Sequence, residues 1–388
     1  MKHVGSVHRY GGVLLLQSFL LLTLPLAARA QHTPLQATLA RFETRLASDV
    51  AADSIGSISA AVFHRERILW ARSFGWASVD PPRPAETDFI YRTGSISKSF
   101  TAVLLMLLVQ DGLVALDDPV ERHLPELSAL ADRPEGAAPI TFRHLASHTS
   151  GLIREPRLQG AAAGPIELWE EKVLASLPHT SFQSAPGERY SYSNIGFGIL
   201  GLALSRAANR PFMELVEERI FSPLGMVDSA FIVPPSNRLR LAAGYANQRD
   251  GRVDADAPAR EHAGRGYKVP NGGVYATVAD LARFSAALTG TSPASLLTEA
   301  SRRQMLEVQT PESETGGYGL GFSISTTREG ERLVGHGGSV AGYTAHLLVE
   351  PESGYGVVLL RNYGSGRTNL GGATRQVLLE ILATHRPR

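Results

Sequence analysis

The 388-residue sequence predicts an α+β fold, in which an antiparallel sheet is flanked by helices and carries an inserted all-helical subdomain. Segments rich in β-branched and aromatic residues, typical of strands, occur near both ends of the chain. Between them, over residues 113–290, short helical segments alternate with connectors rich in proline and glycine. We therefore expect residues 31–112 and 291–388 to form the α/β part, and residues 113–290 to form a mainly helical subdomain.

The first elements expected after residue 30 are a helix and a pair of strands. Residues 35–51 place apolar side chains at helical spacing. Residues 57–63 and 67–77 have strand character, and the short polar connection between them is typical of a hairpin. Residues 95–110, SISKSFTAVLLMLLVQ, then predict an apolar helix, which Asp111 and Gly112 end in the manner of a C-cap.

The remaining elements follow the same two patterns. Four helices are expected in the middle of the chain, at 166–177, 196–208, 212–221 and 277–288. Strand character returns near the C-terminus, at 319–326, 332–338, 344–351 and 355–362. A last helix is expected at 372–385.

The first thirty residues have the layout of a secretory signal peptide. Lys2 and Arg9 give a basic start, residues 13–26 are apolar, and Ala28-Arg29-Ala30 is a small-x-small cleavage site. The apolar run is shorter than the roughly 20 residues that span a bilayer. We expect residues 1–30 to be removed, leaving residues 31–388 as one exported domain, periplasmic or secreted, without a stable membrane anchor.

Composition excludes several classes of function. Without residues 1–30 the chain keeps 35 basic and 37 acidic residues, a net charge of −2. This balance lacks the basic footprint of a protein that binds DNA or RNA. The chain has no cysteine, so it forms no disulfide and performs no thiol chemistry. Its 43% hydrophobic content predicts an ordinary packed core.

Ser95 and Lys98, in the stretch TGSISKSF, are the first candidate catalytic pair. Residues three apart share one face of a helix, so the lysine amine can reach the serine hydroxyl. Serine is a weak nucleophile until a neighbouring base takes its proton, and a buried lysine can act as that base. Lysine is also rare here, since only four of the 38 basic residues are lysines (2, 98, 172 and 268). The four-residue pattern alone favours an ordinary helix start with a solvated lysine. The apolar run that follows favours a catalytic pair instead, because a helix that is apolar on nearly all sides is buried, and its lysine is buried with it.

Two further motifs carry candidate chemistry. Tyr192 and Asn194 are two residues apart, so that a phenol and an amide can face one site. His336, Gly337, Gly338 and Ser339 end an expected strand, where glycines permit close approach and free N–H groups can hold an oxyanion. Taken singly, each is also explained by an ordinary turn.

Three other patterns resemble functional motifs but lack the context that each motif requires. Residues 196–201 match GxGxxG but follow no strand, which favours close helix packing over nucleotide binding. His144 and His148 are four apart but lack the glutamate of a zinc-binding HExxH helix, so we interpret HLASHTSGL as a structural turn. Residues 337–341 narrowly miss the GxSxG nucleophile elbow.

Together, and in this order, SxxK, YxN and a strand-borne HGG resemble the serine β-lactamase and penicillin-binding-protein superfamily, in particular its class C-like branch. Flanking stretches such as ITFRHLASHTSGL, PGERYSYSNIGFGILG and GYGLGFSI resemble this branch too, and the similarity covers nearly all of residues 38–380. The resemblance implies the β-lactamase-like fold, with the active site between the sheet and the helical subdomain. It implies no metal and no cofactor.

The resemblance also implies a role for each site residue. Ser95 would be the acylated nucleophile and Lys98 its proton acceptor. Tyr192 would carry a proton to the leaving group, and Asn194 would hold both the substrate amide and Lys98. The N–H groups of Ser95 and Ser339 would form the oxyanion hole.

The third motif departs from the Lys-Thr-Gly of class C β-lactamases. His336, largely neutral near pH 7, stands where that family has a permanent cation that attracts the β-lactam carboxylate. We therefore expect an exported serine hydrolase that acts on a small ester or peptide-like amide through an acyl-enzyme on Ser95. Two alternatives stay open: a class C-type β-lactamase, and a penicillin-recognising protein that is acylated without efficient turnover.

Overall fold

The computed structural model describes residues 33–247, 253–254, 264–291, 294, 296–310 and 316–385. Its main feature is an eight-stranded sheet with the order β3-β2-β1-β12-β11-β10-β9-β8, paired antiparallel throughout. The strands are β1 (Ser57–His64), β2 (Arg67–Val79), β3 (Pro82–Pro84), β8 (Gly316–Tyr318), β9 (Ser323–Thr326), β10 (Arg332–Val340), β11 (Tyr343–Val349) and β12 (Tyr355–Arg361). The α+β fold predicted from the sequence is confirmed.

The two ends of the chain meet in the centre of this sheet. β1 pairs antiparallel with β12, with Ala61 opposite Val358. All but the last residue of β1 is buried, because helices cover both faces of the sheet at this point. The near-continuous apolar sequence SISAAVF is what such a position requires.

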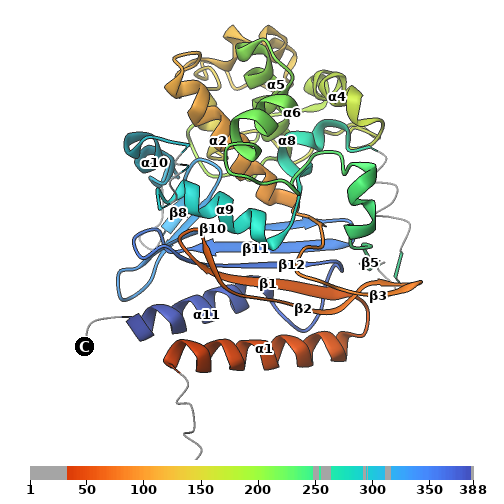
Figure 1. Ribbon diagram of the computed structural model, residues 1–388. Helices are drawn as coiled ribbons and strands as arrows, with labels where there is room; N and C mark the ends of the chain where they lie inside the picture. The colour runs from red at the N-terminus through yellow and green to blue at the C-terminus, as the bar shows by residue number, and fades with distance from the viewer. Residues whose placement is uncertain are drawn as a thin grey trace, which may run out of the picture.

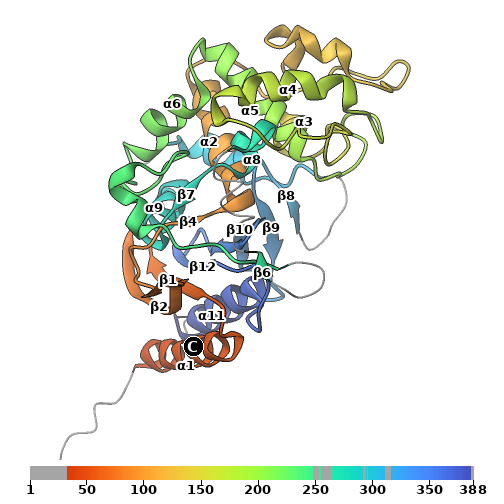
Figure 2. The same ribbon diagram turned by 90° about the vertical axis from the view of Figure 1, so that its right-hand side faces the viewer.

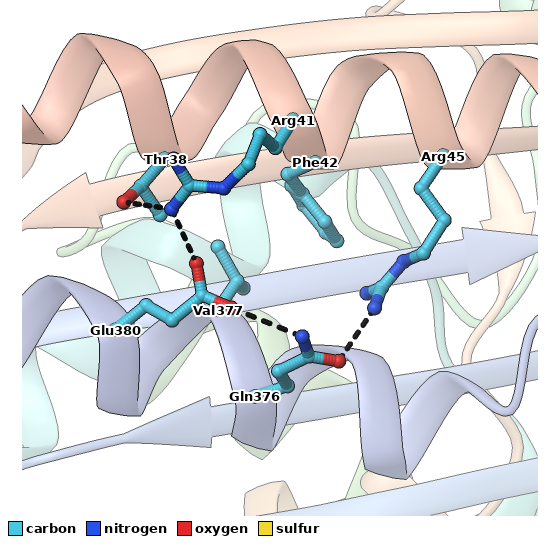
Figure 3. Close-up of a pocket in the computed structure, with 7 residues that line it drawn as sticks. All are labelled: Thr38, Arg41, Phe42, Arg45, Gln376, Val377 and Glu380. Atoms are coloured by element: carbon cyan, nitrogen blue, oxygen red, sulfur yellow. Dashed lines mark hydrogen bonds and ion pairs between the residues drawn. The ribbon is translucent and has the colours of Figure 1, made fainter.

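Two terminal helices cover one face. α1 (Pro34–Asp53) and α11 (Leu370–His385) lie side by side below the sheet in Figure 1, one from each end of the chain. Their apolar stripes pack with the outer side chains of β1, β2 and β12 into one hydrophobic cluster. Figure 3 shows the polar groove between the two helices, where Arg41 donates a hydrogen bond to Glu380 and Arg45 to Gln376. None of the predicted site residues lines that groove.

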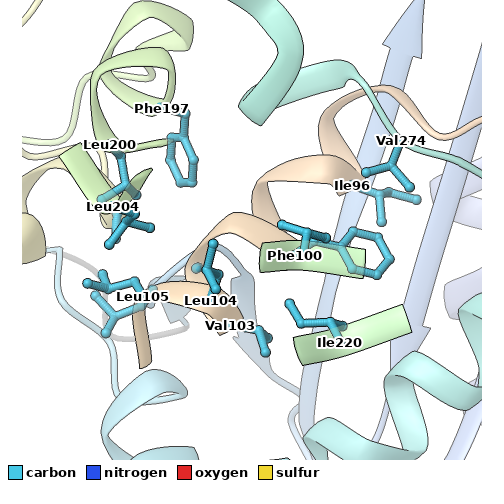
Figure 4. Close-up of a cluster of buried hydrophobic side chains, with 14 of the residues drawn as sticks. Ile96, Phe100, Val103, Leu104, Leu105, Phe197, Leu200, Leu204, Ile220 and Val274 are labelled. Carbon is cyan, nitrogen blue, oxygen red and sulfur yellow. The ribbon is translucent and has the colours of Figure 1, made fainter. Parts of the chain in front are cut away.

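The opposite face carries α2 (Ser97–Gln110) and α9 (Val278–Leu288). α2 is apolar on nearly all sides, and twelve of its residues are buried, as expected of a helix enclosed by other parts of the chain. Figure 4 shows Phe100, Val103 and Leu104 of α2 among side chains from the neighbouring helices. α9 falls inside the range expected to be the helical subdomain, yet it packs against β1 and β12 of the sheet.

The remaining helices form a layer above the sheet (Figures 1 and 2). They are α3 (Phe142–Ala146), α4 (Trp169–Ser176), α5 (Asn194–Ala208), α6 (Phe212–Val216), α8 (Val269–Gly272) and α10 (Glu299–Met305). Two short strand pairs accompany them: β4 (Tyr91–Arg92) with β7 (Tyr275–Ala276), and β5 (Ala246–Asn247) with β6 (Val253–Asp254).

Element boundaries differ from the sequence-based expectations by a few residues. The strand expected at 319–326 is shorter, because residues 319–322 turn before β9 begins at Ser323. The glycine-rich edge strand β8 carries too few side chains to give a strand pattern. No helix of the described residues is long and apolar enough to cross a membrane. The expected signal peptide, residues 1–30, lies outside the described residues.

Candidate active site

Ser95 and Lys98 lie at the start of the buried helix. A 3-10 turn, Gly94–Ile96, carries Ser95 and continues into α2, whose second residue is Lys98. Lys98 Nζ lies 3.2 Å from Ser95 Oγ. Gly94 has φ +54°, and a Cβ atom there would lie 2.7 Å from the Ser339 nitrogen. A glycine is therefore required where the nucleophile's turn meets β10.

Lys98 is fully buried, and its amine contacts two oxygens. Besides Ser95 Oγ, Nζ donates a hydrogen bond of 3.1 Å to the backbone oxygen of Asn271. Burial lowers the pKa of Lys98 well below its ordinary value, the positive charges of Arg154 and Lys268 lower it further, and Glu155 acts in the opposite direction. The amine therefore readily loses its proton, as a base toward Ser95 must.

Tyr192 completes a triangle with this pair. The centroid of its ring lies 4.9 Å from Lys98 Nζ, and its hydroxyl is close enough to the Ser95 side chain for Ser95 to affect its pKa. Burial raises the pKa of Tyr192 to about 12, although Ser95 and Arg154 oppose this shift. Tyr192 is therefore a neutral phenol near pH 7, able to donate its proton, while Lys98 is the better proton acceptor.

His148 supports the tyrosine. Its ring centroid lies 4.1 Å from that of Tyr192, and its Nδ1 accepts a hydrogen bond of 3.1 Å from the backbone N–H of Ser193. The His148 backbone oxygen accepts from the N–H of Ser191 at 2.7 Å. The interpretation of HLASHTSGL as a turn holds for the backbone, since His148 has φ +60°, but the sequence did not indicate that this turn supports Tyr192.

Asn194 lies at the first turn of α5 and faces the same space. Its Nδ2 donates a hydrogen bond of 2.6 Å to Glu155. This bond fixes the orientation of the amide, so that Oδ1 points away from Glu155. Oδ1 is buried and has no hydrogen-bond partner among the described residues. Asn194 thus holds no bond to Lys98, unlike the expectation. Asn271 binds Lys98 instead, and its Nδ2 donates to the Asn194 backbone oxygen at 2.8 Å.

The glycine motif of β10 lies directly beside the nucleophile. A Cβ atom at Gly338 would overlap the Thr93 backbone oxygen and lie 3.2 Å from the Ser95 nitrogen. The close approach of β10 to the turn Gly94–Ile96 brings the N–H of Ser95 near that of Ser339. Gly337 is less crowded, since a Cβ atom there would lie 3.5 Å from its nearest neighbour, His346 Cδ2. The structure thus brings together two donors of the kind that stabilise an oxyanion.

His336 is buried and paired with a tyrosine that the sequence analysis did not single out. Its Nε2 lies 2.8 Å from the Tyr318 hydroxyl, and its Nδ1 lies 2.6 Å from the Gly337 backbone oxygen. Burial, together with Lys98, lowers the pKa of His336 to about 3. The imidazole is therefore neutral, with Nδ1–H donating to Gly337 and Nε2 accepting from Tyr318.

A pocket of about 240 Å³ lies beside Ser95. Ser95, Asn194 and Ser339 line it, together with four residues of the segment 265–272: Arg265, Lys268, Asn271 and Gly272. Glycines of α5 allow that segment to approach: a Cβ at Gly198 would lie 3.0 Å from the Tyr267 oxygen, and one at Gly201 would overlap Pro270. The GxGxxG match is therefore a helix-packing feature, as interpreted from the sequence.

Sequence reasoning placed Ser95, Lys98, Tyr192, Asn194 and the β10 motif, and the structure brings all of them together. It missed several residues of the same site: Arg92, His148, Arg154, Glu155, Lys268, Asn271 and Tyr318. For Lys268 a signal was present, since it is one of only four lysines in the chain. No group of three or more metal-ligating side chains gathers anywhere in the described part of the chain.

Proteins of known family resemble this chain over most of its length. The family model described as Beta-lactamase matches residues 42–380. "Putative beta-lactamase-like 1" of Homo sapiens is 32% identical over 345 residues, 84% of this chain and 65% of the length of that relative. "D-alanyl-D-alanine-carboxypeptidase/endopeptidase AmpH" of Escherichia coli K12 is 27% identical, covering 80% of this chain and 81% of the relative.

A solved structure has a similar fold. The D-stereospecific amidohydrolase from a Streptomyces species superimposes with a TM-score of 0.69 at 25% identity, covering 88% of this chain and 97% of that one. Fold and similarity define a serine hydrolase with a β-lactamase-like architecture. The chain belongs to the beta-lactamase family.

Proposed function

We propose that this protein is an exported serine hydrolase that cleaves a small peptide-like amide or ester through an acyl-enzyme on Ser95. The observation that carries the proposal is the contact of 3.2 Å between Ser95 Oγ and the fully buried amine of Lys98. A lysine in this position has little reason to be buried as a structural group, because burying an amine costs free energy. Placed against a serine, it supplies a base.

The proposed reaction has two halves. Ser95 Oγ attacks the substrate carbonyl carbon while its proton passes to Lys98 Nζ, and the N–H groups of Ser95 and Ser339 hold the oxyanion. When the bond to the leaving atom breaks, that atom takes a proton from the Tyr192 hydroxyl, which regains one from Lys98. In the second half the protons move in the reverse direction. Water gives a proton to Tyr192 as it attacks the acyl carbon, and Ser95 Oγ takes a proton back from Lys98 as the acid is released.

Asn194 favours an amide-containing substrate over a simple ester. Its buried Oδ1 lacks a hydrogen-bond partner among the described residues, and such an acceptor is costly unless a ligand satisfies it. A substrate N–H on the acyl side would do so. The names of the Escherichia coli carboxypeptidase/endopeptidase and the Streptomyces D-stereospecific amidohydrolase point to the same class, amides of D-amino acids.

The neutral state of His336 argues against an efficient β-lactamase. With its pKa near 3, His336 offers no positive charge to a β-lactam carboxylate at neutral pH. We therefore expect β-lactams to acylate Ser95 and to be hydrolysed slowly. Replacing His336 by lysine should raise β-lactam turnover, and an unchanged rate would contradict this account.

A substrate panel tests the proposal. Short p-nitrophenyl esters, D-alanyl-D-alanine peptides, D-amino acid amides and a chromogenic cephalosporin are compared by kcat/KM, and intact mass after quenching shows any acyl adduct. We expect hydrolysis of the amides and esters, a Ser95-linked adduct with penicillin, and loss of all of these in Ser95→Ala. A Ser95→Ala protein that kept wild-type ester hydrolysis would refute the mechanism.

Export rests on the sequence of residues 1–30 and needs its own test. We expect the protein purified from the periplasm or the culture medium to begin at Gln31 when its N-terminus is sequenced. An intact Met1 on protein recovered only from the cytoplasm would refute export.

A further inference from the structure

Both ring nitrogens of His336 are engaged in hydrogen bonds within the protein. Nδ1 donates to the Gly337 backbone oxygen at 2.6 Å, and Nε2 accepts from the Tyr318 hydroxyl at 2.8 Å. A neutral imidazole has one donor and one acceptor, and both are used here. The side chain that replaces the cation of the third motif therefore acts on the protein itself rather than on a substrate.

Tyr318 is held firmly in front of that imidazole. It belongs to the edge strand β8, it is 4% exposed, and its ring packs against those of His148 at 4.8 Å and Tyr190 at 5.9 Å. Burial raises the pKa of its hydroxyl well above the ordinary value, so it stays a neutral donor. In the sheet, β9 lies between β8 and β10 (Figure 2). The bond from Tyr318 to His336 therefore joins two strands that are not neighbours.

This bond is placed where β10 loses the support of β9. In the described part of the sheet, β9 pairs with residues 332–335 of β10 and ends there, so residues 336–340 pair with β11 alone. On their other side these residues meet the turn that carries Ser95. The end of β10 that carries Ser339 is therefore held by one strand, by its contact with that turn and by the bond to Tyr318.

Ser339 is the residue for which this support matters. Its N–H and that of Ser95 would hold the oxyanion, and the two donors belong to different elements, β10 and the turn before α2. Such donors must lie about 3 Å from the oxygen that becomes charged, and a misplacement of about 1 Å costs roughly 100-fold in rate. The imidazole binds the oxygen of Gly337, two residues before Ser339. Tyr318 can therefore act on the oxyanion donor through His336.

We propose that Tyr318 is a positioning residue for the oxyanion hole: through His336 it fixes the strand that presents the Ser339 N–H. The inference deepens the proposed function and rests on it for the role of Ser339. It gives the third motif of this chain a task other than attracting a substrate carboxylate. A lysine at position 336 can donate to the Tyr318 oxygen instead of accepting from it, so His336→Lys does not test this link.

Tyr318→Phe tests the inference, because it removes the hydroxyl and keeps the ring. The oxyanion forms only as the reaction proceeds, so we expect kcat and kcat/KM to fall together by about tenfold while KM stays near wild type. The fall should be the same on a p-nitrophenyl ester and on an amide, because both substrates pass through an oxyanion. A wild-type kcat, or a loss on the amide alone, would overturn the inference.

Tyr363→Phe is the matched control. Tyr363 is also buried, and its hydroxyl donates a hydrogen bond of the same length, 2.8 Å, to Asp53. Asp53 ends α1, which covers the face of the sheet opposite to α2 and Ser95. This replacement also removes one buried hydroxyl, and it should leave kcat unchanged. An equal fall of kcat in the two variants would count against a specific role for Tyr318.

A double-mutant cycle tests whether Tyr318 acts through His336. In His336→Asn the side-chain N–H can still reach the Gly337 oxygen, but the shorter side chain has no acceptor where Nε2 stood. We expect His336→Asn to lower kcat by a similar factor, and Tyr318→Phe to cost nothing further in that background. Losses that multiply in the double variant would show that Tyr318 works by another route.

A measurement without substrate separates this inference from the proposed function. Amide hydrogen exchange, followed by mass spectrometry of peptides that cover residues 336–343, reports how firmly the end of β10 is held. We expect faster local exchange in Tyr318→Phe and in His336→Asn, and wild-type exchange in Tyr363→Phe. If the wild type hydrolyses no substrate, the proposed function fails, while this exchange still decides whether Tyr318 holds the strand. Unchanged exchange in both Tyr318→Phe and His336→Asn would refute the inference.

Discussion

The imidazole of His148 and the phenol of Tyr192 lie face to face, with ring centroids 4.1 Å apart and planes tilted by 34°. The backbone oxygen and Nδ1 of His148 bind the N–H groups of Ser191 and Ser193, the residues on either side of Tyr192. Burial lowers the pKa of His148 well below its ordinary value, and the charge of Lys98 lowers it further. The ring is therefore a neutral acceptor that fixes the tyrosine in front of Ser95.

The first prediction concerns this support. His148→Phe keeps the stacked ring but leaves the buried Ser193 N–H without its acceptor, which should lower the free energy of unfolding by about 1–3 kcal/mol. Urea denaturation followed by circular dichroism measures the change. His144→Phe is the control, because His144 also accepts a backbone N–H, from Thr141, but is only partly buried, so water can replace it. Equal losses in the two variants would contradict the assignment.

The second prediction separates the roles of Tyr192 and Lys98. Tyr192→Phe removes the proton donor, which matters most when the leaving group is a poor one. We expect kcat on an amide to fall by about 10²–10⁴-fold, and kcat on a p-nitrophenyl ester, whose leaving group needs no proton, to fall much less. Lys98→Met should abolish both activities because it removes the base. Equal losses on the two substrates in Tyr192→Phe would show that the phenol acts before the leaving group departs.

Local sequence patterns were sufficient to predict the central strand β1, the buried helix α2 and the contact between Ser95 and Lys98. The apolar runs of β1 and α2 are buried on all sides, so their sequences carry a strong signal. The contact between Ser95 and Lys98 depends only on helical spacing, because both residues lie in one continuous turn. Such features can be read from sequence because neighbours along the chain determine them.

Asn271, Lys268 and His148 reach the site through tertiary contacts, which local sequence patterns do not reveal. The backbone oxygen of Asn271 binds Lys98 across 173 positions of the chain, and no side-chain pattern records the use of a carbonyl. Lys268 reaches the pocket because Gly198 and Gly201 let its segment approach α5. The sequence feature that places Lys268 is therefore a pair of glycines on another element, the helix α5. His148 was set aside as part of a turn, because its contact with Tyr192 appears only once the turn is packed against residues 191–193.

The third prediction uses two neighbouring glycines of β10. An added methyl at Gly338 would overlap the Thr93 carbonyl and push the strand away from the Ser95 turn, separating the two oxyanion donors. At Gly337 the nearest atom, His346 Cδ2, would lie 3.5 Å away, an ordinary contact. We expect Gly338→Ala to lower kcat by about 10²–10³-fold, as loss of an oxyanion donor does, and Gly337→Ala to stay near wild type. Similar activities in the two variants would show that this strand does not supply the oxyanion hole.

The last prediction follows from the charges around Lys98, whose neutral form must be present for attack. The acid limb of kcat/KM against pH should therefore report the pKa of Lys98 in the free enzyme, with activity rising as pH rises through it. Arg154 lowers this pKa and Glu155 raises it. Arg154→Met should then move the limb to higher pH, and Glu155→Gln, which can still accept from Asn194, should move it to lower pH. Both side chains are partly exposed, at 64% and 40%, so screening limits each shift to roughly 0.2–0.5 pH units.

Arg157→Met, an exposed arginine on the same connection, is the control and should leave the limb in place. Raising the salt concentration should shrink both shifts, because the interactions cross solvent. His336 should not contribute to the limb above pH 5, since its pKa lies near 3 and it stays neutral throughout this range. A limb close to pH 12 would identify Tyr192 as the titrating base instead. Shifts of the same sign in the Arg154 and Glu155 variants would show that the limb does not report a lysine between these two charges.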